Sequence, residues 1–158
     1  MKTRRIVTRA IIAKDDKLLL VCHKIHDEGA GRKNDFYCTP GGGLNEGESL
    51  VEGVKREVIE ETGITPKVGR LLFIQQYKND VREYLEFFFH VTNAEDFENV
   101  DLSLSTHGEF EIEEIGFYDL KKINILPQFL QDIDPSKIDL IDEVKVFSYL
   151  VDVSSSKN

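Results

Sequence analysis

The sequence predicts an α/β fold in which a mixed sheet is flanked by helices. The length of 158 residues, with 41% hydrophobic and 31% charged residues, is typical of one globular domain, here residues 1–158. A capped amphipathic helix is predicted between pairs of strands, as expected where helices and strands alternate along a chain. Alternating or continuous apolar runs predict the strands, at 4–12, 17–23, 67–78 and 82–92.

The first two predicted strands are joined by a tight turn. Residues 4–12 alternate between two faces, whereas residues 17–23 contain a continuous apolar run. Asp15 and Asp16 lie between these runs and predict the turn of a hairpin. A polar loop at 23–35 follows and leads into a short strand.

The polar loop at 23–35 carries charged side chains and two histidines. Because it returns directly to a glycine-rich turn, we expect it to border a substrate pocket, where Arg32 and Lys33 would contact a phosphate. A purely solvated role for these two side chains is the alternative. His23 and His26 are three residues apart, but zinc sites usually need a fuller ligand set. We therefore expect no metal at the histidines.

A helix is predicted at 50–62 because both of its ends carry capping signals. Ser49 and Glu52 form a capping box at the start, and Gly63 is suited to the C′ position at the end. Immediately upstream, the Pro-Gly-Gly-Gly turn at 40–43 lets the backbone adopt positive φ and pass close to a ligand.

Three glutamates of this helix share one face. Glu57, Glu60 and Glu61 have the spacing i, i+3 and i+4, and carboxylates this close repel each other unless a cation lies among them. Clustered oxygen ligands suit a hard divalent cation, Mg²⁺ or Mn²⁺. The alternative is a solvated acidic helix face.

The stretch from Gly42 to Ile64, GGLNEGESLVEGVKREVIEETGI, resembles the Nudix box, Gly-x5-Glu-x7-Arg-Glu-U-x-Glu-Glu-x-Gly-U, with U a bulky apolar residue. A chance match is on the order of 10⁻¹⁰ per starting position. Every specified position is filled, by Gly42, Glu48, Arg56, Glu57, Val58, Glu60, Glu61, Gly63 and Ile64. The resemblance implies a Nudix-like α/β/α sandwich, with the box as a loop–helix–loop beside the mixed sheet.

The resemblance also implies roles for the residues of the box. Arg56 and Glu48 would pair and hold the loop and the helix in register, which supports the ligands without contacting the metal. The metal would be bound by Glu57 and Glu61, with Glu60 as a third ligand or helper and the carbonyl of Gly41 as a further ligand.

The general base that activates water is left open between two sets of carboxylates. In the Nudix family this base is either a glutamate of the box or a carboxylate from a later loop. Glu57 and Glu60 are the candidates in the box. Glu109 and Glu111 lie in an acidic run where such a loop residue would be found.

Two strands follow the box, at 67–78 and 82–92, with a turn at Asn79 and Asp80 between them. Alternation in the first strand predicts that Leu72 and Phe73 face opposite sides. We expect the aromatic side chains of the second strand to be buried in the core. A platform for a nucleobase is the alternative.

The last third of the chain combines acidic loops with further regular structure. An acidic loop is predicted at 93–105, and the segment 107–120 begins with carboxylates and ends in an apolar strand. Apolar spacing at 137–151 predicts an amphipathic helix that covers one face of the sheet. The tail at 154–158 is expected to be disordered.

The activity implied by the resemblance is hydrolysis of a diphosphate linkage in a nucleoside diphosphate joined to another moiety, or in a nucleoside triphosphate. The sequence does not indicate which of these is the substrate. One alternative is a catalytically silent Nudix-fold nucleotide sensor. Another is a Nudix-fold isomerase of isopentenyl diphosphate, but such enzymes need a catalytic cysteine, and Cys22 and Cys38 do not lie in a matching motif.

The composition narrows the classes of partner. The net charge of −9 argues against a dedicated nucleic-acid or acidic-membrane binder, and no apolar run reaches the roughly 18 residues of a membrane span. Two cysteines are too few for a disulfide framework, so we expect reduced thiols in the cytoplasm. The expected partner is a small nucleoside diphosphate derivative, and a homodimer is left open.

Overall fold

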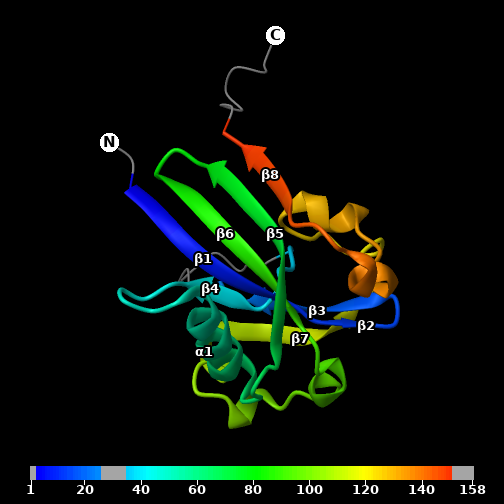
Figure 1. Ribbon diagram of the computed structural model, residues 1–158. Helices are drawn as coiled ribbons and strands as arrows, with labels where there is room; N and C mark the ends of the chain where they lie inside the picture. Colours follow the sequence, from blue (N-terminus) through cyan, green and yellow to red (C-terminus); the bar gives the residue numbers. More distant parts are fainter. Residues whose placement is uncertain (1–2, 26–34, 151–158) are drawn as a thin grey trace.

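The computed structural model describes residues 3–25 and 35–150 (Figure 1). Along the chain, the strands (β), α-helices (α) and 3₁₀ segments (η) are β1 (Thr3–Ile11), β2 (Ala13–Lys14), β3 (Lys17–His23), β4 (Gly41–Gly43), α1 (Leu50–Thr62), β5 (Val68–Lys78), β6 (Arg82–Val91), η1 (Ala94–Phe97), η2 (Leu102–Leu104), α2 (Gly108–Glu111), β7 (Ile112–Tyr118), η3 (Gln128–Asp132), η4 (Pro135–Leu140) and β8 (Lys145–Tyr149). None of the described helices is long and apolar enough to cross a bilayer.

The strands form two sheets that lie against each other in Figure 1. The larger sheet has the order β4-β1-β6-β5-β8, and the smaller one has the order β2-β3-β7. Strand β1 runs parallel to β6, and β5 runs parallel to β8, whereas β4 and β1 are antiparallel, as are β5 and β6. The prediction of a mixed sheet with flanking helices in an α/β fold is therefore confirmed.

The predicted hairpin between the first strands is also present. The turn falls at Asp15 and Asp16, and Asp15 has a positive φ of 54°. Aspartate tolerates this left-handed conformation better than most residues, because its short side chain can hydrogen-bond to the local backbone.

The predicted C-terminal helix at 137–151 was wrong. The first part of this range belongs to η4, and residues Lys145–Tyr149 form strand β8, which pairs with β5 at the edge of the larger sheet. The side chain of Phe147 stacks on Phe129, with ring centroids 4.1 Å apart. The sequence KVFSY has β-branched and aromatic residues that suit a strand, so tertiary pairing decided between two patterns that both fit.

The predicted alternation in β5 was wrong at one point. Leu72 and Phe73 were expected on opposite faces, but both are buried in the same apolar cluster. The register of pairing with β6 shifts between Leu71 and Phe73. A β-bulge, which inserts one extra residue into a strand, produces a shift of this kind. This irregularity turns two consecutive side chains toward one side of the sheet.

The larger sheet is covered on both faces by apolar clusters. Val54 and Val58 of α1 pack with Ala10 on one face, and Phe129 of η3 packs with Phe73 on the other. The second covering layer therefore consists of the short segments η3 and η4 in place of a long helix. The smaller sheet contributes buried side chains to both clusters, because β3 is buried along most of its length.

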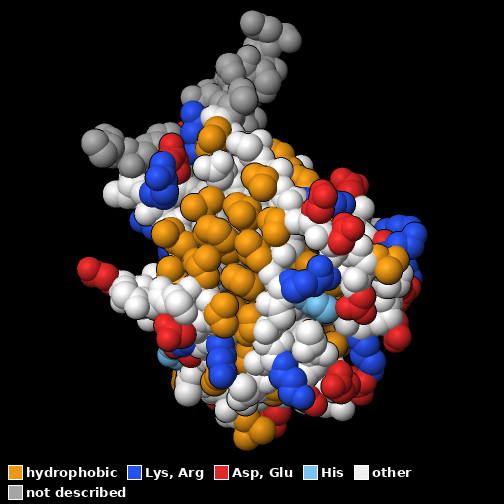
Figure 2. Space-filling model, in the orientation of Figure 1, with side chains coloured by type: hydrophobic (Ala, Val, Ile, Leu, Met, Phe, Trp, Pro, Cys, Tyr) orange, Lys and Arg blue, Asp and Glu red, His pale blue; other side chains and the backbone are white. Residues whose placement is uncertain are grey.

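Helix α1 covers only part of its face of the sheet. Figure 2 shows hydrophobic side chains gathered over β1, β6 and β5, beside the helix. Register places Ile6 opposite Leu85, and Ile74 opposite both Phe87 and Val146, so these side chains form one apolar patch. Val146 is 64% exposed, and the patch is open to solvent.

Candidate active site

The helix that carries the three glutamates has the predicted limits. Ser49 is the N-cap, and its side chain accepts a hydrogen bond from the N–H of Glu52, whose carboxylate accepts one from the N–H of Ser49. Gly63 ends the helix with a φ of 74°. A left-handed residue at this position is favourable for glycine, which has no Cβ to clash.

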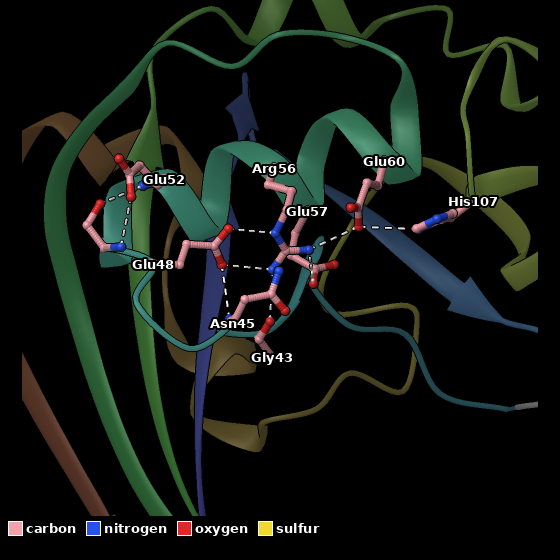
Figure 3. Close-up of polar contacts among 9 residues, drawn as sticks. Gly43, Asn45, Glu48, Glu52, Arg56, Glu57, Glu60 and His107 are labelled. Carbon is pink, nitrogen blue, oxygen red and sulfur yellow. Dashed lines mark hydrogen bonds and ion pairs between the residues drawn. The ribbon is translucent and has the colours of Figure 1, made fainter.

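Arg56 is the centre of a network of polar contacts on this helix (Figure 3). Its Nε and Nη2 donate to the two carboxylate oxygens of Glu48 at 2.7 and 2.9 Å. Its Nη1 donates to Glu57 at 3.0 Å and to Glu60 at 3.1 Å, and Nη2 also donates to the carbonyl of Gly43 at 3.0 Å. The bidentate contact with Glu48 joins the loop to the helix, and the guanidinium holds the pKa of Glu48 below its usual value.

Glu57 lies against the glycine turn. A Cβ on Gly42 would be 2.7 Å from Cδ of Glu57 and 2.8 Å from both of its oxygens, so a larger residue there would force this carboxylate to move. Burial raises the pKa of Glu57, and the hydrogen bond and charge of Arg56 oppose that shift. The turn and the helix are thus in close contact where the box pattern places Gly42 and Glu57.

Glu61 is the most buried carboxylate of the three. It is 2% exposed, and burial raises its pKa to about 8, although the nearby charge of Arg9 opposes this. The backbone N–H of Gly41 also opposes the rise in its pKa. Its Oε2 has no hydrogen-bond partner among the described residues, and neither do the buried hydroxyls of Thr8 and Thr39 near the same turn. Buried oxygens of this kind require a partner, which a bound cation or an ordered water would supply.

Glu60 lies at the outer side of the network. It contacts Arg56, and its Oε2 is 3.2 Å from Nδ1 of His107. The N–H of His107 also donates to the backbone carbonyl of Glu60 at 2.9 Å. The segment that contains α2 is therefore attached to the end of α1.

Helix α2 contains the two later carboxylates that were considered for the general base. Glu109 and Glu111 are both exposed. Glu111 is among the groups whose negative charge raises the pKa of Glu61, which places it in the electrostatic surroundings of the box. Glu109 accepts a hydrogen bond from Nζ of Lys24 through its backbone carbonyl.

Arg32, Lys33 and His26 lie outside the described residues, as does the tail at 154–158. His23 is described at the end of β3, where burial lowers its pKa.

Arg9 was missed in the sequence, although it belongs to the site. Its Nη1 donates to the carbonyls of Thr39 at 3.2 Å and Gly41 at 3.4 Å. Its Nε lies 3.6 Å from a carboxylate oxygen of Glu86, which is 4% exposed. The alternation of β1 places Arg9 on the same face as buried Ile11, and an arginine with most of its side chain removed from solvent requires a partner. That requirement was the signal that could have identified Arg9.

The oxygen atoms around the glycine turn fit a hard divalent cation. Among the described residues, no three His, Cys, Asp or Glu side chains are gathered into a ready ligand set, because Glu57 and Glu60 are turned toward Arg56. The unpartnered Oε2 of Glu61, the adjacent carboxylate of Glu57 and the carbonyl of Gly41 are nevertheless the donor types that Mg²⁺ and Mn²⁺ prefer. Arg56 carries one positive charge against the carboxylates of Glu48, Glu57 and Glu60, so the cluster retains excess negative charge.

The chain resembles known hydrolases in sequence. It is 38% identical to the mouse (Mus musculus) oxidized purine nucleoside triphosphate hydrolase over 77 residues, 46% of each protein. It is 40% identical to the ADP-ribose pyrophosphatase of Methanocaldococcus jannaschii over 70 residues, 42% of this chain and 37% of the relative. The mouse diphosphoinositol polyphosphate phosphohydrolase 3-alpha is 33% identical over 92 residues, 58% of this chain and 51% of the relative. The matched region thus spans about half or less of these relatives.

Solved structures share the fold. The MutT protein of Methanosarcina mazei Go1 superposes with a TM-score of 0.62 and 28% identity, over 88% of this chain and 95% of that one. A UDP-X diphosphatase superposes with a TM-score of 0.65 and 22% identity, over 93% and 68%. A family model described as the NUDIX domain matches residues 2–144. The chain therefore belongs to the Nudix family of hydrolases.

Proposed function

We propose that the protein is a divalent-cation-dependent hydrolase that cleaves the diphosphate linkage of a nucleoside diphosphate joined to another moiety, or of a nucleoside triphosphate. The observation that carries the proposal is the buried, unpartnered Oε2 of Glu61 beside Gly41. An ionised carboxylate at this depth is unfavourable without a cation.

The substrate class rests on what the relatives have in common. The names of the relatives mention an oxidized purine nucleoside triphosphate, ADP-ribose and a diphosphoinositol polyphosphate. These molecules differ in their organic parts, but each contains a phosphate–phosphate linkage. We therefore propose that this protein cleaves a phosphate–phosphate linkage, and the screen below is designed to identify the organic part of its substrate.

The roles of the side chains follow from their positions. Glu57 and Glu61 would hold Mg²⁺ or Mn²⁺ together with the carbonyl of Gly41, and Glu60 would serve as a third ligand once it leaves Arg56. When bound, such a cation lowers the pKa of a coordinated water and neutralises charge on phosphoryl oxygens. Arg56 would keep the carboxylate of Glu57 directed at the turn.

A carboxylate must also accept the proton of the attacking water. Glu111 is our first candidate, because it is exposed and lies in the electrostatic surroundings of Glu61. Glu109 on the same short helix is the second. Glu57 and Glu60 are the candidates within the box, and both contact Arg56 in this structure.

The test is a phosphate-release screen over nucleoside diphosphate sugars, dinucleotides, nucleoside triphosphates and capped RNA. Each substrate is assayed with Mg²⁺, with Mn²⁺ and with excess EDTA. We expect turnover of at least one substrate with the cations and none with EDTA. Undiminished turnover in EDTA would refute the proposed mechanism. Nucleotide binding without turnover of any substrate would favour a silent binding module instead.

A further inference from the structure

Strand β4 directs a backbone carbonyl of the candidate site away from the sheet. Gly41 lies opposite Arg9 in the antiparallel register, and the N–H of the next residue, Ala10, donates to the carbonyl of Pro40 at 2.8 Å. Hydrogen-bonded and non-hydrogen-bonded pairs alternate in such a ladder. The Gly41–Arg9 pair is therefore of the second kind, and the carbonyl of Gly41 accepts no hydrogen bond from the backbone of β1.

Two carbonyls of β4 each accept a hydrogen bond from an arginine side chain. Arg56 donates to the carbonyl of Gly43 at 3.0 Å, and Arg9 donates to the carbonyl of Gly41 at 3.4 Å. Arg9 also donates to the carbonyl of Thr39, on the other side of Pro40, at 3.2 Å. Arg9 is thus the counterpart of Arg56 outside the box. Because a carbonyl oxygen has two lone pairs, Gly41 can accept from Arg9 and still bind a cation.

Each of these arginines is in turn held by a glutamate. Arg56 contacts Glu48, and Arg9 contacts Glu86, whose carboxylate is buried. A buried ion pair is weak evidence for stability, because well-packed apolar residues often replace such pairs without loss. Stability alone is therefore a weak explanation for the Arg9–Glu86 pair.

We propose that Arg9, held by Glu86, is a positioning residue that fixes the carbonyl of Gly41 for the divalent cation. The inference rests on the proposed function, since it assigns a role toward the same cation. The position requires glycine, because its φ of 148° is rare for other residues and a Cβ there would be 2.1 Å from the carbonyl oxygen of Thr8. Glu86 also offsets the positive charge of Arg9, which would otherwise repel the cation.

The test measures Mn²⁺ affinity by electron paramagnetic resonance on the full chain, and thermal stability in EDTA. In the double variant Arg9→Met/Glu86→Leu, both charges are removed together, so neither is left buried alone. We expect this variant to melt near the wild type but to bind Mn²⁺ roughly 10-fold more weakly or worse, as when supporting partners of metal ligands are lost. If the pair is merely structural, the double variant should melt near the wild type and bind Mn²⁺ with wild-type affinity.

The matched control is Arg4→Met/Glu83→Leu. Arg4 and Glu83 form an ion pair of 3.1 Å on the same two strands, but they are 66% and 37% exposed and lie away from the turn. We expect wild-type Mn²⁺ affinity in this control. The single variant Arg9→Lys keeps the charge beside Glu86 but lacks the guanidinium fork, so it should fold and still bind Mn²⁺ more weakly.

Two results would count against the inference in different ways. Wild-type Mn²⁺ affinity in both Arg9 variants would overturn the positioning role and leave the proposed function intact. If the unaltered chain binds no Mn²⁺, and Glu61→Gln changes nothing, the proposed function fails and the role of Arg9 fails with it.

Discussion

Gly42 faces the carboxylate of Glu57 so closely that the two residues set each other's positions: a Cβ at Gly42 would lie 2.7 Å from Cδ of Glu57. Gly42→Ala should therefore displace this carboxylate. A misplacement of about 1 Å at a reacting centre can cost roughly 10²-fold in rate, so we expect a loss of that order in kcat/KM. Steady-state kinetics at saturating Mg²⁺ would measure it.

The control for Gly42→Ala is Gly47→Ala in the following loop. Gly47 has a φ of 75°, and a Cβ there would meet no heavy atom within 4 Å. Alanine at Gly47 should cost about 1 kcal/mol of stability through backbone strain while activity remains near wild type. Equal losses of activity in the two variants would show that glycine is needed in this loop for another reason.

Removing the charge of single glutamates should separate the metal site from the helix cap. Glu57→Gln and Glu61→Gln should each lower kcat by roughly 10²-fold or more, because each takes a negative charge from the proposed site. Glu52 takes part in the capping box, and the hydrogen bonds of its side chain to the described residues are those of the box. Glu52→Gln should cost about 1 kcal/mol of stability with little change in turnover. If Glu52→Gln and Glu57→Gln lost equal activity, these assignments along the helix would be wrong.

The general base can be identified by comparing Glu109→Gln with Glu111→Gln. If one of them is the base, its variant should bind Mg²⁺ and substrate as before and lose kcat, because only proton transfer is removed. We expect this result for Glu111→Gln, since its charge acts on Glu61. Metal titration followed by turnover at saturating metal distinguishes this from weakened binding. Wild-type kcat in both variants would transfer the role to Glu57 or Glu60.

The raised pKa of Glu61 predicts how stability depends on pH in EDTA. The folded carboxyl has a pKa of about 8, whereas an unfolded glutamate titrates near about 4.3. Between these values the folded state binds more protons than the unfolded state. Raising the pH across this window should therefore lower the free energy of unfolding, by at most about 1.4 kcal/mol per pH unit for one proton.

Urea titrations of the wild type and of Glu61→Gln in EDTA, between about pH 5 and about pH 8, would measure this effect. Glutamine does not titrate, so the stability of the wild type should fall relative to the variant as the pH rises. Parallel curves would mean that Glu61 is ionised throughout. Saturating Mn²⁺ should remove much of the slope, because a cation favours the ionised form.

The parts of the fold that were predictable depend on local signals. Helix α1 has the predicted limits because Ser49, Glu52 and Gly63 act on residues next to them. The hairpin at Asp15 is local in the same sense. Strand β8 was not predictable, because its sequence fits two patterns and only contact with β5, far away in the chain, selects the strand. The bulge near Leu72 also depends on the neighbouring strand.

In the candidate site, too, local sequence predicts some features, and contacts between distant segments determine the others. The spacing of the glutamates predicts which side chains lie on one face of α1. The glycine turn, which precedes the helix in sequence, predicts which backbone lies beside it. The pairing of Arg9 with Glu86 joins two strands that are distant in sequence and adjacent in the sheet, so no spacing predicts it. The orientation of Glu57 and Glu60 toward Arg56 depends on competition between an arginine and a cation for the same carboxylates, which a sequence does not encode.

Strand β8 also determines when the fold can be completed during translation. It pairs with β5, and Phe147 packs against Phe73 and Phe129, yet residues 145–149 lie beyond the segment that matches the family at 2–144. At roughly 5–20 residues per second, a ribosome takes several seconds to proceed from β5 to β8. During that interval the edge of β5 is open to other extended chains. A version shortened to residue 144 would keep this edge unpaired, and we expect its newly made chains to aggregate more than the full chain.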